Sequence, residues 1–296
     1  MSEATVNETA AGDNAEATEA WDGPLFDRFS TFREVVTTGL ANHGDAALEI
    51  YPPPPGARVL DVGCGFGDAT QRIAELVGPE GSAVGVDVSP RFIEASRRDA
   101  AEAGVENASF EAVDVQTDEL GGPYDHVFSR FGVMFFAGPV PAFRNIRSAM
   151  APGGRLVIVV WRRREDNPWM YRAQQIVEGI VERPTEYDDP TCGPGPFSMA
   201  GADTTSDILL GAGFEGIGFD RIELPIVIGR DLDEAIELVT AIGPAGEIIR
   251  LLGDRAADRL DEIDAALREG LSEYADEDGM LRAGASTWVV TATAPS

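Results

Sequence analysis

The sequence contains no lysine, so all 23 of its basic residues are arginines. They are outnumbered by 51 acidic residues, which gives a net charge of −28 at pH 7. A surface this acidic repels the phosphate backbone of nucleic acids, so we expect neither DNA nor RNA as a partner. The charge itself says nothing about the fold.

Cysteine and histidine are scarce as well, with two residues of each. Cys64 and Cys192 cannot form a disulfide framework, which predicts a reducing, cytoplasmic location. No cluster of His, Cys and acidic residues has the spacing of metal ligands, so we expect no bound metal.

Long hydrophobic runs are also missing. The longest strongly apolar run, Leu156 to Trp161, is too short to cross a bilayer, and we expect no membrane insertion. The first basic residue is Arg28, so the start of the chain lacks the positive region of a signal peptide. Residues 1–19 are predicted to be a disordered acidic tail.

What the chain does contain is an apolar strand that ends in alternating glycines. Residues 59–62 are followed by Gly63, Gly65 and Gly67, and residues 69–77 have helical periodicity. Glycines leave the backbone bare at this point, and the first amides of a helix favour a negative group. The stretch predicts a site for a polar, nucleotide-like ligand, although glycine is also the ordinary residue of tight turns.

A second buried strand, residues 83–87, places an acid about 20 residues beyond the glycines. At this strand end Asp87 can accept hydrogen bonds from two ribose hydroxyls, and Val88 follows it at the same edge. Dinucleotide enzymes and S-adenosylmethionine enzymes share this layout. The order D-x-G-x-G-x-G, which begins at Asp61, favours the second class, because a carboxylate suits an ammonium group better than a pyrophosphate.

On these residues the chain resembles the class I S-adenosylmethionine-dependent methyltransferases. Their glycine signature is matched by Asp61, Gly63, Gly65 and Gly67, and Cys64, a small residue that fills the same turn, is a further candidate cofactor contact. The resemblance implies S-adenosylmethionine as cofactor and a Rossmann-like three-layer α/β sandwich. Its seven-stranded sheet would be mostly parallel with one antiparallel strand.

Two further strand ends supply candidate cofactor contacts. Residues 108–113 lead to Asp114, which can accept from the adenine amine, and to Val115, which offers the ring an apolar face. Asp114 can equally be a turn-forming residue. Ligands of open α/β sheets lie outside the carboxyl ends of the strands. The strand 124–131 places three side chains there, namely Ser129, Arg130 and Phe131.

Residues 20–55 are predicted to form an N-terminal helical lid, with one helix over residues 25–50 that prolines 52–55 end. In methyltransferases similar to this chain such a segment folds over the cofactor. Trp21 is therefore a candidate cofactor contact, or else an anchor for the helix. The sequence identifies no catalytic base, and His43 is the candidate for that role.

Residues 20–296 are predicted to be a single methyltransferase domain. In it, residues 56–162 are the cofactor-binding core and residues 163–296 are substrate-side segments that complete the sheet. The expected elements are a turn at 151–154, a strand at 155–161, a helix at 167–182, a loop at 184–203, a helix at 203–211, and strands at 214–228 and 286–294. Two or three amphipathic helices over residues 231–275 separate the last two strands, which form a plain hairpin in a minimal methyltransferase. This insertion is predicted to form a cap near the substrate entrance.

The sequence therefore predicts methyl transfer to a small, largely apolar acceptor molecule. We expect acceptor contacts from Phe131, Met134, Trp161 and Trp169, which follow the ends of adjacent strands. A NAD-dependent dehydrogenase is the alternative enzyme, disfavoured by the glycine spacing and by the absence of a Tyr-x-x-x-Lys pair. A non-catalytic binding protein with this fold is the other alternative. The atom that is methylated and the oligomeric state stay open.

Overall fold

The computed structural model describes residues 18–185 and 194–296. The predicted acidic tail lies outside the described residues except for Thr18 and Glu19, which are helical. Cys192 and the middle of the predicted loop 184–203 also lie outside them. In the part of the chain that the structure describes, no helix is both long and apolar enough to span a membrane.

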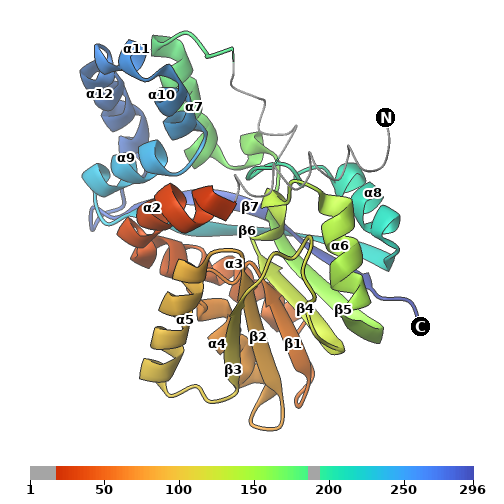
Figure 1. The fold of residues 1–296 in the computed structure, drawn as a ribbon. Coiled ribbons are helices and arrows are strands. Elements are labelled where there is room, and N and C mark those ends of the chain that lie inside the picture. The colour runs from red at the N-terminus through yellow and green to blue at the C-terminus, as the bar shows by residue number, and fades with distance from the viewer. Residues whose placement is uncertain (1–17, 186–193) are drawn as a thin grey trace.

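The described residues form a seven-stranded sheet with the order β3-β2-β1-β4-β5-β7-β6 (Figure 1). Its strands are β1 (Arg58–Val62), β2 (Ser82–Asp87), β3 (Ala108–Ala112), β4 (Tyr124–Arg130), β5 (Met150–Trp161), β6 (Glu215–Gly229) and β7 (Leu281–Thr293). Strand β7 runs antiparallel to both of its neighbours, and β1 to β5 are parallel. The predicted fold class is confirmed.

Alternate residues of β5 pack on opposite faces of the sheet, as the pleat requires. Val157 and Val159 pack with helices of one face, whereas Leu156 and Ile158 pack with helices of the other. The first face carries α3 (Ala41–Ile50), α4 (Asp68–Val77) and α5 (Pro90–Ala103), and the second carries α6 (Pro139–Ser148) and α8 (Ala202–Ala212). Burial on both faces explains why this strand reads as a continuous apolar run.

Local signals in the sequence fix the two ends of α5. The side chain of Ser89 caps the helix by accepting from the amide of Phe92 at 3.3 Å, and Pro90 occupies its first turn. Gly104 ends it with a left-handed φ of 71°. The start of α5 is thereby placed directly after the end of β2.

A helical cap lies beyond one end of the sheet (Figure 1). It consists of α7 (Pro168–Ile180), α9 (Leu232–Ala241), α10 (Pro244–Leu252), the short α11 (Asp254–Ala257) and α12 (Leu260–Leu271). The insertion between β6 and β7 thus holds four α-helices, one more than the upper number predicted. Val177, Ile248 and Leu267 join them in a common core and are all fully buried.

Three predicted boundaries are wrong. The predicted single helix 25–50 is broken into α2 (Phe26–Thr31) and α3, joined by a π-helical segment, Val35–Gly39. The break occurs at Phe32, whose φ of −102° and ψ of 24° leave the helix. The predicted turn 151–154 is an irregular part of β5, where the amide of Gly153 donates to the carbonyl of Ala294, just past the end of β7. Strand β7 begins at Leu281 rather than at 286, because residues 281–285 pair with the far half of β6.

Phe143 on α6 offers a test of the packing. Its side chain is fully buried and makes edge contacts with Phe136 and Phe214 at centroid distances of 5.8 and 6.5 Å. Phe143→Ala should lower the free energy of unfolding by about 3–5 kcal/mol, the range for an aromatic deletion in a core. Urea denaturation measures this loss. Leu210→Ala is the control, because Leu210 is 59% exposed and should shift stability by no more than about 0.5 kcal/mol. Similar losses in both variants would contradict this account of the core.

Candidate functional site

The three glycines of the turn after β1 have different structural roles. All three have left-handed φ values, 68° at Gly63, 54° at Gly65 and 78° at Gly67. A Cβ on Gly63 would lie 2.8 Å from the Cα of Gly132, and one on Gly67 would collide with Phe110 and Ser96. A Cβ on Gly65 would meet nothing within 4 Å. Gly63 and Gly67 therefore serve the packing of the loop, and Gly65 presents its backbone to open space.

Asp87 joins this turn to the start of α5. One carboxylate oxygen accepts from the amide of Gly65 and the other from the amide of Ser89, both at 3.0 Å. Burial raises the pKa of Asp87 to about 6, and the hydrogen bonds from the amides of Ser89, Gly65 and Val88 oppose that rise. The carboxylate is therefore fixed in position with further lone pairs left for a ligand.

Asp61 lies behind the turn rather than in front of it. Its side chain is 1% exposed and accepts a 2.6 Å hydrogen bond from the hydroxyl of Thr70 on α4. Burial raises the pKa of Asp61 to about 7, against the effects of that hydrogen bond and of the Arg130 charge. The buried side chain of Asp61 does not face the cavity, as a direct contact with an ammonium group would require. Its bond with Thr70 instead stabilises the glycine loop.

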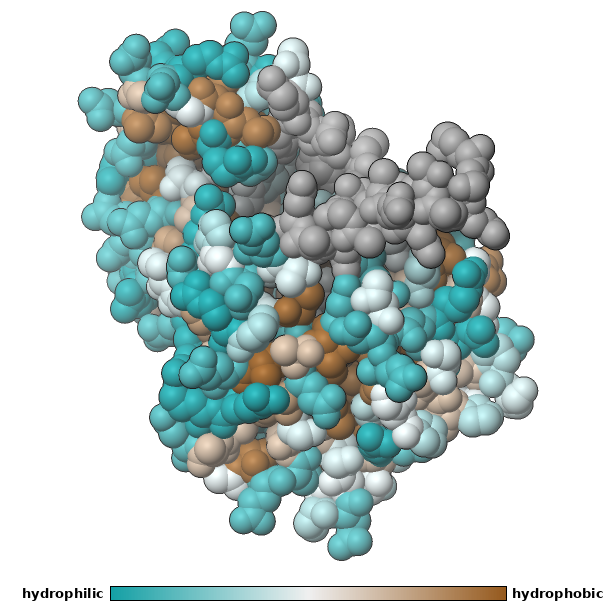
Figure 2. Space-filling model, viewed as in Figure 1, coloured by the Kyte–Doolittle hydropathy of each residue, from teal (hydrophilic) through white to brown (hydrophobic). Residues whose placement is uncertain are grey.

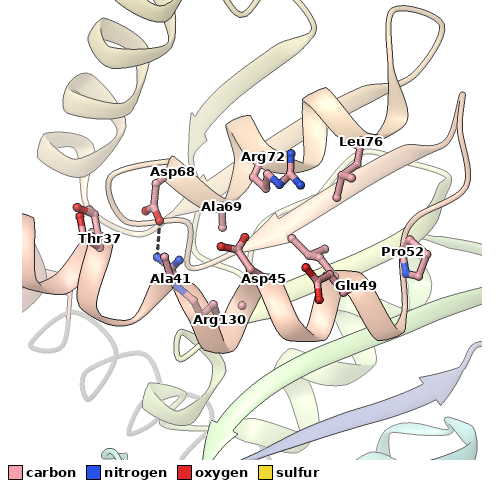
Figure 3. A pocket seen from close by; sticks show the side chains of 13 residues that line it. Thr37, Ala41, Asp45, Glu49, Pro52, Asp68, Ala69, Arg72, Leu76 and Arg130 are labelled. Carbon is pink, nitrogen blue, oxygen red and sulfur yellow. Dashed lines mark ion pairs between the residues drawn. The ribbon is translucent and has the colours of Figure 1, made fainter. Parts of the chain in front are cut away.

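Arg130 is the last residue of β4 and forms a 2.8 Å ion pair with Asp68 at the start of α4. Both residues line two cavities. One lies at the carboxyl ends of the strands and is called the main cavity, because most of the predicted site residues line it. The second has a volume of about 680 Å³ and lies between α3 and α4 (Figure 3). The carboxylates of Asp45 and Glu49 also line this second cavity, on the side of α3. The ion pair therefore lies in a wall that the two cavities share.

The main cavity has a volume of about 660 Å³ and extends from the strand ends to the cap. The structure brings thirteen of the predicted site residues into its wall, namely Trp21, Gly63, Cys64, Gly65, Asp87, Val88, Asp114, Val115, Arg130, Phe131, Met134, Trp161 and Trp169. It does not place Asp61, Gly67, Ser129 or His43 in that wall. Ser129 is fully buried and donates to the carbonyl of Val62 at 2.7 Å.

Stacked aromatic rings form one wall of the cavity. Phe131 and Trp161 stack at 4.2 Å with an interplanar angle of 16°, and Trp169 contacts Trp161 edge-on at 6.2 Å. Phe131 adopts a φ of 62°, which is unfavourable for a side chain of this size. Strained backbone of this kind clusters at functional sites, and here it turns the ring onto Trp161.

His43 packs against this aromatic wall but is fully buried itself. Its ring lies 6.4 Å from that of Phe131 and 5.9 Å from that of Trp161, and its Nδ1 is 2.9 Å from the hydroxyl of Thr287. Burial lowers the pKa of His43 to about 4, which the backbone of Leu224 opposes in part. A neutral imidazole in this position supports the wall.

The sequence reasoning missed the residues that close the cavity from the cap and lid. They are Val35, Val36 and Leu40 of the lid, Ile226, Val227 and Ile228 of β6, and Leu238, Ala241, Ile242, Gly243 and Pro244 around the junction of α9 and α10. The regular apolar spacing of Ile236, Val239 and Ile242 could have pointed to this part of the wall, but only Ile242 lines the cavity, whereas the other two are buried in the core. On the face shown in Figure 2, most of the surface is hydrophilic and hydrophobic side chains gather near its centre and on the cap.

Residues 54–188 match the model of a methyltransferase domain family. Aklanonic acid methyltransferase DauC of Streptomyces sp. strain C5 is 34% identical over 114 residues, which are 38% of this chain and 52% of that protein. The ubiquinone/menaquinone biosynthesis C-methyltransferase UbiE of Pseudomonas fluorescens is 31% identical over 116 residues, 38% of this chain and 45% of that protein. The chain thus spans about half the length of these two relatives. Nocamycin O-methyltransferase of Saccharothrix syringae is 30% identical over 201 residues, 64% of this chain and 66% of that protein.

Solved structures share the fold at low sequence identity. The YcgJ protein of Bacillus subtilis superposes with a TM-score of 0.56 at 16% identity and covers 86% of this chain and 99% of its own. The [4+2]-cyclase SpnF superposes with a TM-score of 0.50 at 19% identity and covers 86% and 80%. The domain match, the curated relatives and the glycine turn agree that residues 54–188 form a methyltransferase domain of the class I S-adenosylmethionine-dependent type.

Proposed function

We propose that this protein transfers a methyl group from S-adenosylmethionine to a small, largely apolar molecule. One observation carries the proposal. A single cavity joins the bare glycine turn and the fixed carboxylate of Asp87 at one end to an aromatic and aliphatic chamber at the other. A cofactor and an acceptor bound in such a cavity meet at the junction between its two halves.

The residues of the first half fit the cofactor. Gly65 leaves room for a ligand against its backbone, Asp87 offers acceptors for ribose hydroxyls, and Arg130 offers a cation for a carboxylate. Asp114 and Val115 line the cavity where an adenine amine and ring would need an acceptor and an apolar surface. When bound, S-adenosylmethionine supplies an electrophilic methyl group.

The remaining task of the protein is to position the acceptor and to exclude water. The stacked pair Phe131 and Trp161 gives a flat apolar surface, and Trp169 closes it at an angle. Holding two reactants in line in a dry chamber removes much of the entropic barrier to their reaction. Burial lowers the pKa of His43 to about 4 and the residue does not line the cavity, which argues against its role as the catalytic base.

The named relatives support a small-molecule acceptor. One acts on aklanonic acid, one is a nocamycin O-methyltransferase, and one acts in quinone biosynthesis. The apolar chamber and the acidic surface fit the same class, because the surface repels anionic polymers.

Two alternatives make different predictions. A NAD-dependent dehydrogenase would bind NAD, and a non-catalytic protein of this fold would bind S-adenosylhomocysteine without turning over the cofactor. Calorimetric titration with NAD and S-adenosylhomocysteine, followed by transfer of labelled methyl groups to candidate acceptors, separates these cases.

Asp87 gives the first test of the cofactor site. Asp87→Ala should weaken S-adenosylhomocysteine binding by about 1.5–3 kcal/mol, because the ribose loses a charged hydrogen-bond acceptor. Asp207→Ala, an exposed acid on α8, is the matched control and should bind as the natural sequence does. Isothermal calorimetry on folded protein measures both, and an unchanged affinity in Asp87→Ala would remove Asp87 from the site.

The raised pKa of Asp87 gives a second test. An acid with a pKa of about 6 is ionised at pH 8 and largely protonated at pH 5. S-adenosylhomocysteine should therefore bind with constant affinity above about pH 7 and progressively more weakly below pH 6, by up to about tenfold per pH unit. Asp87→Ala should lose this pH dependence. A flat profile in the natural sequence, with the fold intact by circular dichroism, would rule out the carboxylate as a ribose acceptor.

Turnover should need no divalent metal. In residues 18–185 and 194–296, no three His, Cys, Asp or Glu side chains form a group that could hold an ion. With an identified acceptor, the methylation rate should be the same in a chelator and in added magnesium. A rate that the chelator abolishes and magnesium restores would show that a metal takes part.

A further inference from the structure

The acceptor half of the cavity contains a cation that the proposed reaction does not use. Arg28 lies on α2 and lines the cavity together with Phe29, Val36 and Ile242. The other charged residue in this half of the described wall is Glu247 on α10. The remaining charged lining residues, such as Asp87 and Arg130, belong to the cofactor half.

Arg28 has spare hydrogen-bonding capacity. Its Nη1 donates one long bond of 3.4 Å to the carbonyl of Ala241, whereas a guanidinium carries five N–H donors. No ion pair links it to an acid in the part of the chain that the structure describes, although the chain carries 51 acids. Arg130, the other cation in the cavity wall, is in contrast paired with Asp68.

Two acids that could neutralise Arg28, its sequence neighbour Asp27 and the cavity-lining Glu247, already have other partners. Glu247 holds Arg250 through two hydrogen bonds of 2.7 and 2.6 Å, and Asp27 pairs with Arg91 at 2.7 Å. Arg28 is thus an unneutralised cation that faces an apolar chamber. A charge in such surroundings is screened less than in water, so an anion placed beside it binds more strongly.

We propose that the acceptor is a carboxylate-bearing, ring-containing molecule and that Arg28 binds its carboxylate. This inference rests on the proposed function. The guanidinium fork matches a carboxylate in two parallel hydrogen bonds. The ring lies against Phe131 and Trp161, so the acceptor is held at two points and its reacting atom is turned toward the strand ends. The net charge of −28 repels anions in general, so a specific cation is needed to admit one.

A simpler role for Arg28 is structural. Ala241 is the last residue of α9, and a cation near a helix C-terminus stabilises it. The two roles predict different ligand affinities. If Arg28 only stabilises the end of α9, a carboxylate ligand and an amide of the same shape should bind equally well, whereas a carboxylate-binding Arg28 should favour the carboxylate.

The test compares two probes, 2-naphthoate and 2-naphthamide, in the presence of saturating S-adenosylhomocysteine. Calorimetry or quenching of tryptophan fluorescence gives the dissociation constant of each. In the natural sequence, 2-naphthoate should bind at least about tenfold more tightly, as expected for one charged hydrogen-bonded pair. Arg28→Met should reduce this preference below about threefold, and Arg28→Lys, which keeps the charge without the fork, should retain part of it.

Arg255→Met is the matched control. Arg255 is exposed on α11 and does not line the cavity, and its substitution changes the net charge by the same amount as Arg28→Met. It should keep the full preference. Equal affinities for the two probes in the natural sequence, including no detectable binding of either, would overturn the inference, and so would a preference that survives in Arg28→Met. Binding of S-adenosylhomocysteine separates this failure from that of the proposed function. If it binds but the preference is absent, the inference about the acceptor fails alone. If it does not bind, the cofactor assignment fails too.

Discussion

The close contact between Gly63 and Gly132 holds the candidate site together. The loop after β1 and the loop after β4 can touch only because neither glycine has a side chain there, as a Cβ on either would lie within 3 Å of the other loop. This contact places the open backbone of Gly65 on one side and the strained Phe131 on the other. Cofactor half and acceptor half are thus parts of one cavity rather than two separate sites.

The sequence predicts well which residues gather in the proposed cofactor half, because their placement is set locally. A strand of known end, a glycine turn and an acid at the next strand end require only short-range geometry, so Gly65, Asp87, Asp114 and Val115 lie in the cavity wall as expected. Direction is harder to predict than position. Asp61 and Ser129 sit at predicted strand ends, but the pleat turns both side chains into the protein, where Thr70 and Val62 are their partners.

The lid shows why contacts between distant parts of the chain are not predicted from the sequence. Its residue Asp22 accepts from the hydroxyl of Ser89 and the amide of Arg91, so the lid is fastened to the first turn of α5 beside Asp87. Phe26 adds an edge contact with Phe92 at 4.8 Å. No periodicity in residues 20–55 encodes these contacts, because those of Asp22 join residues 67 and 69 positions apart in the chain.

The division of the cavity also limits what family membership says about the acceptor. The family match covers residues 54–188, which include the glycine turn, Asp87 and the aromatic wall of Phe131, Trp161 and Trp169. The lid, β6 and the α9–α10 junction, which supply Arg28 and most of the aliphatic lining, lie outside it. Similarity to methyltransferases therefore bears on the proposed cofactor half and on the aromatic wall, but not on the rest of the acceptor half. The chemistry of the acceptor has to be argued from side chains of the unmatched segments, among which the unneutralised guanidinium of Arg28 is the feature that an apolar core alone does not require.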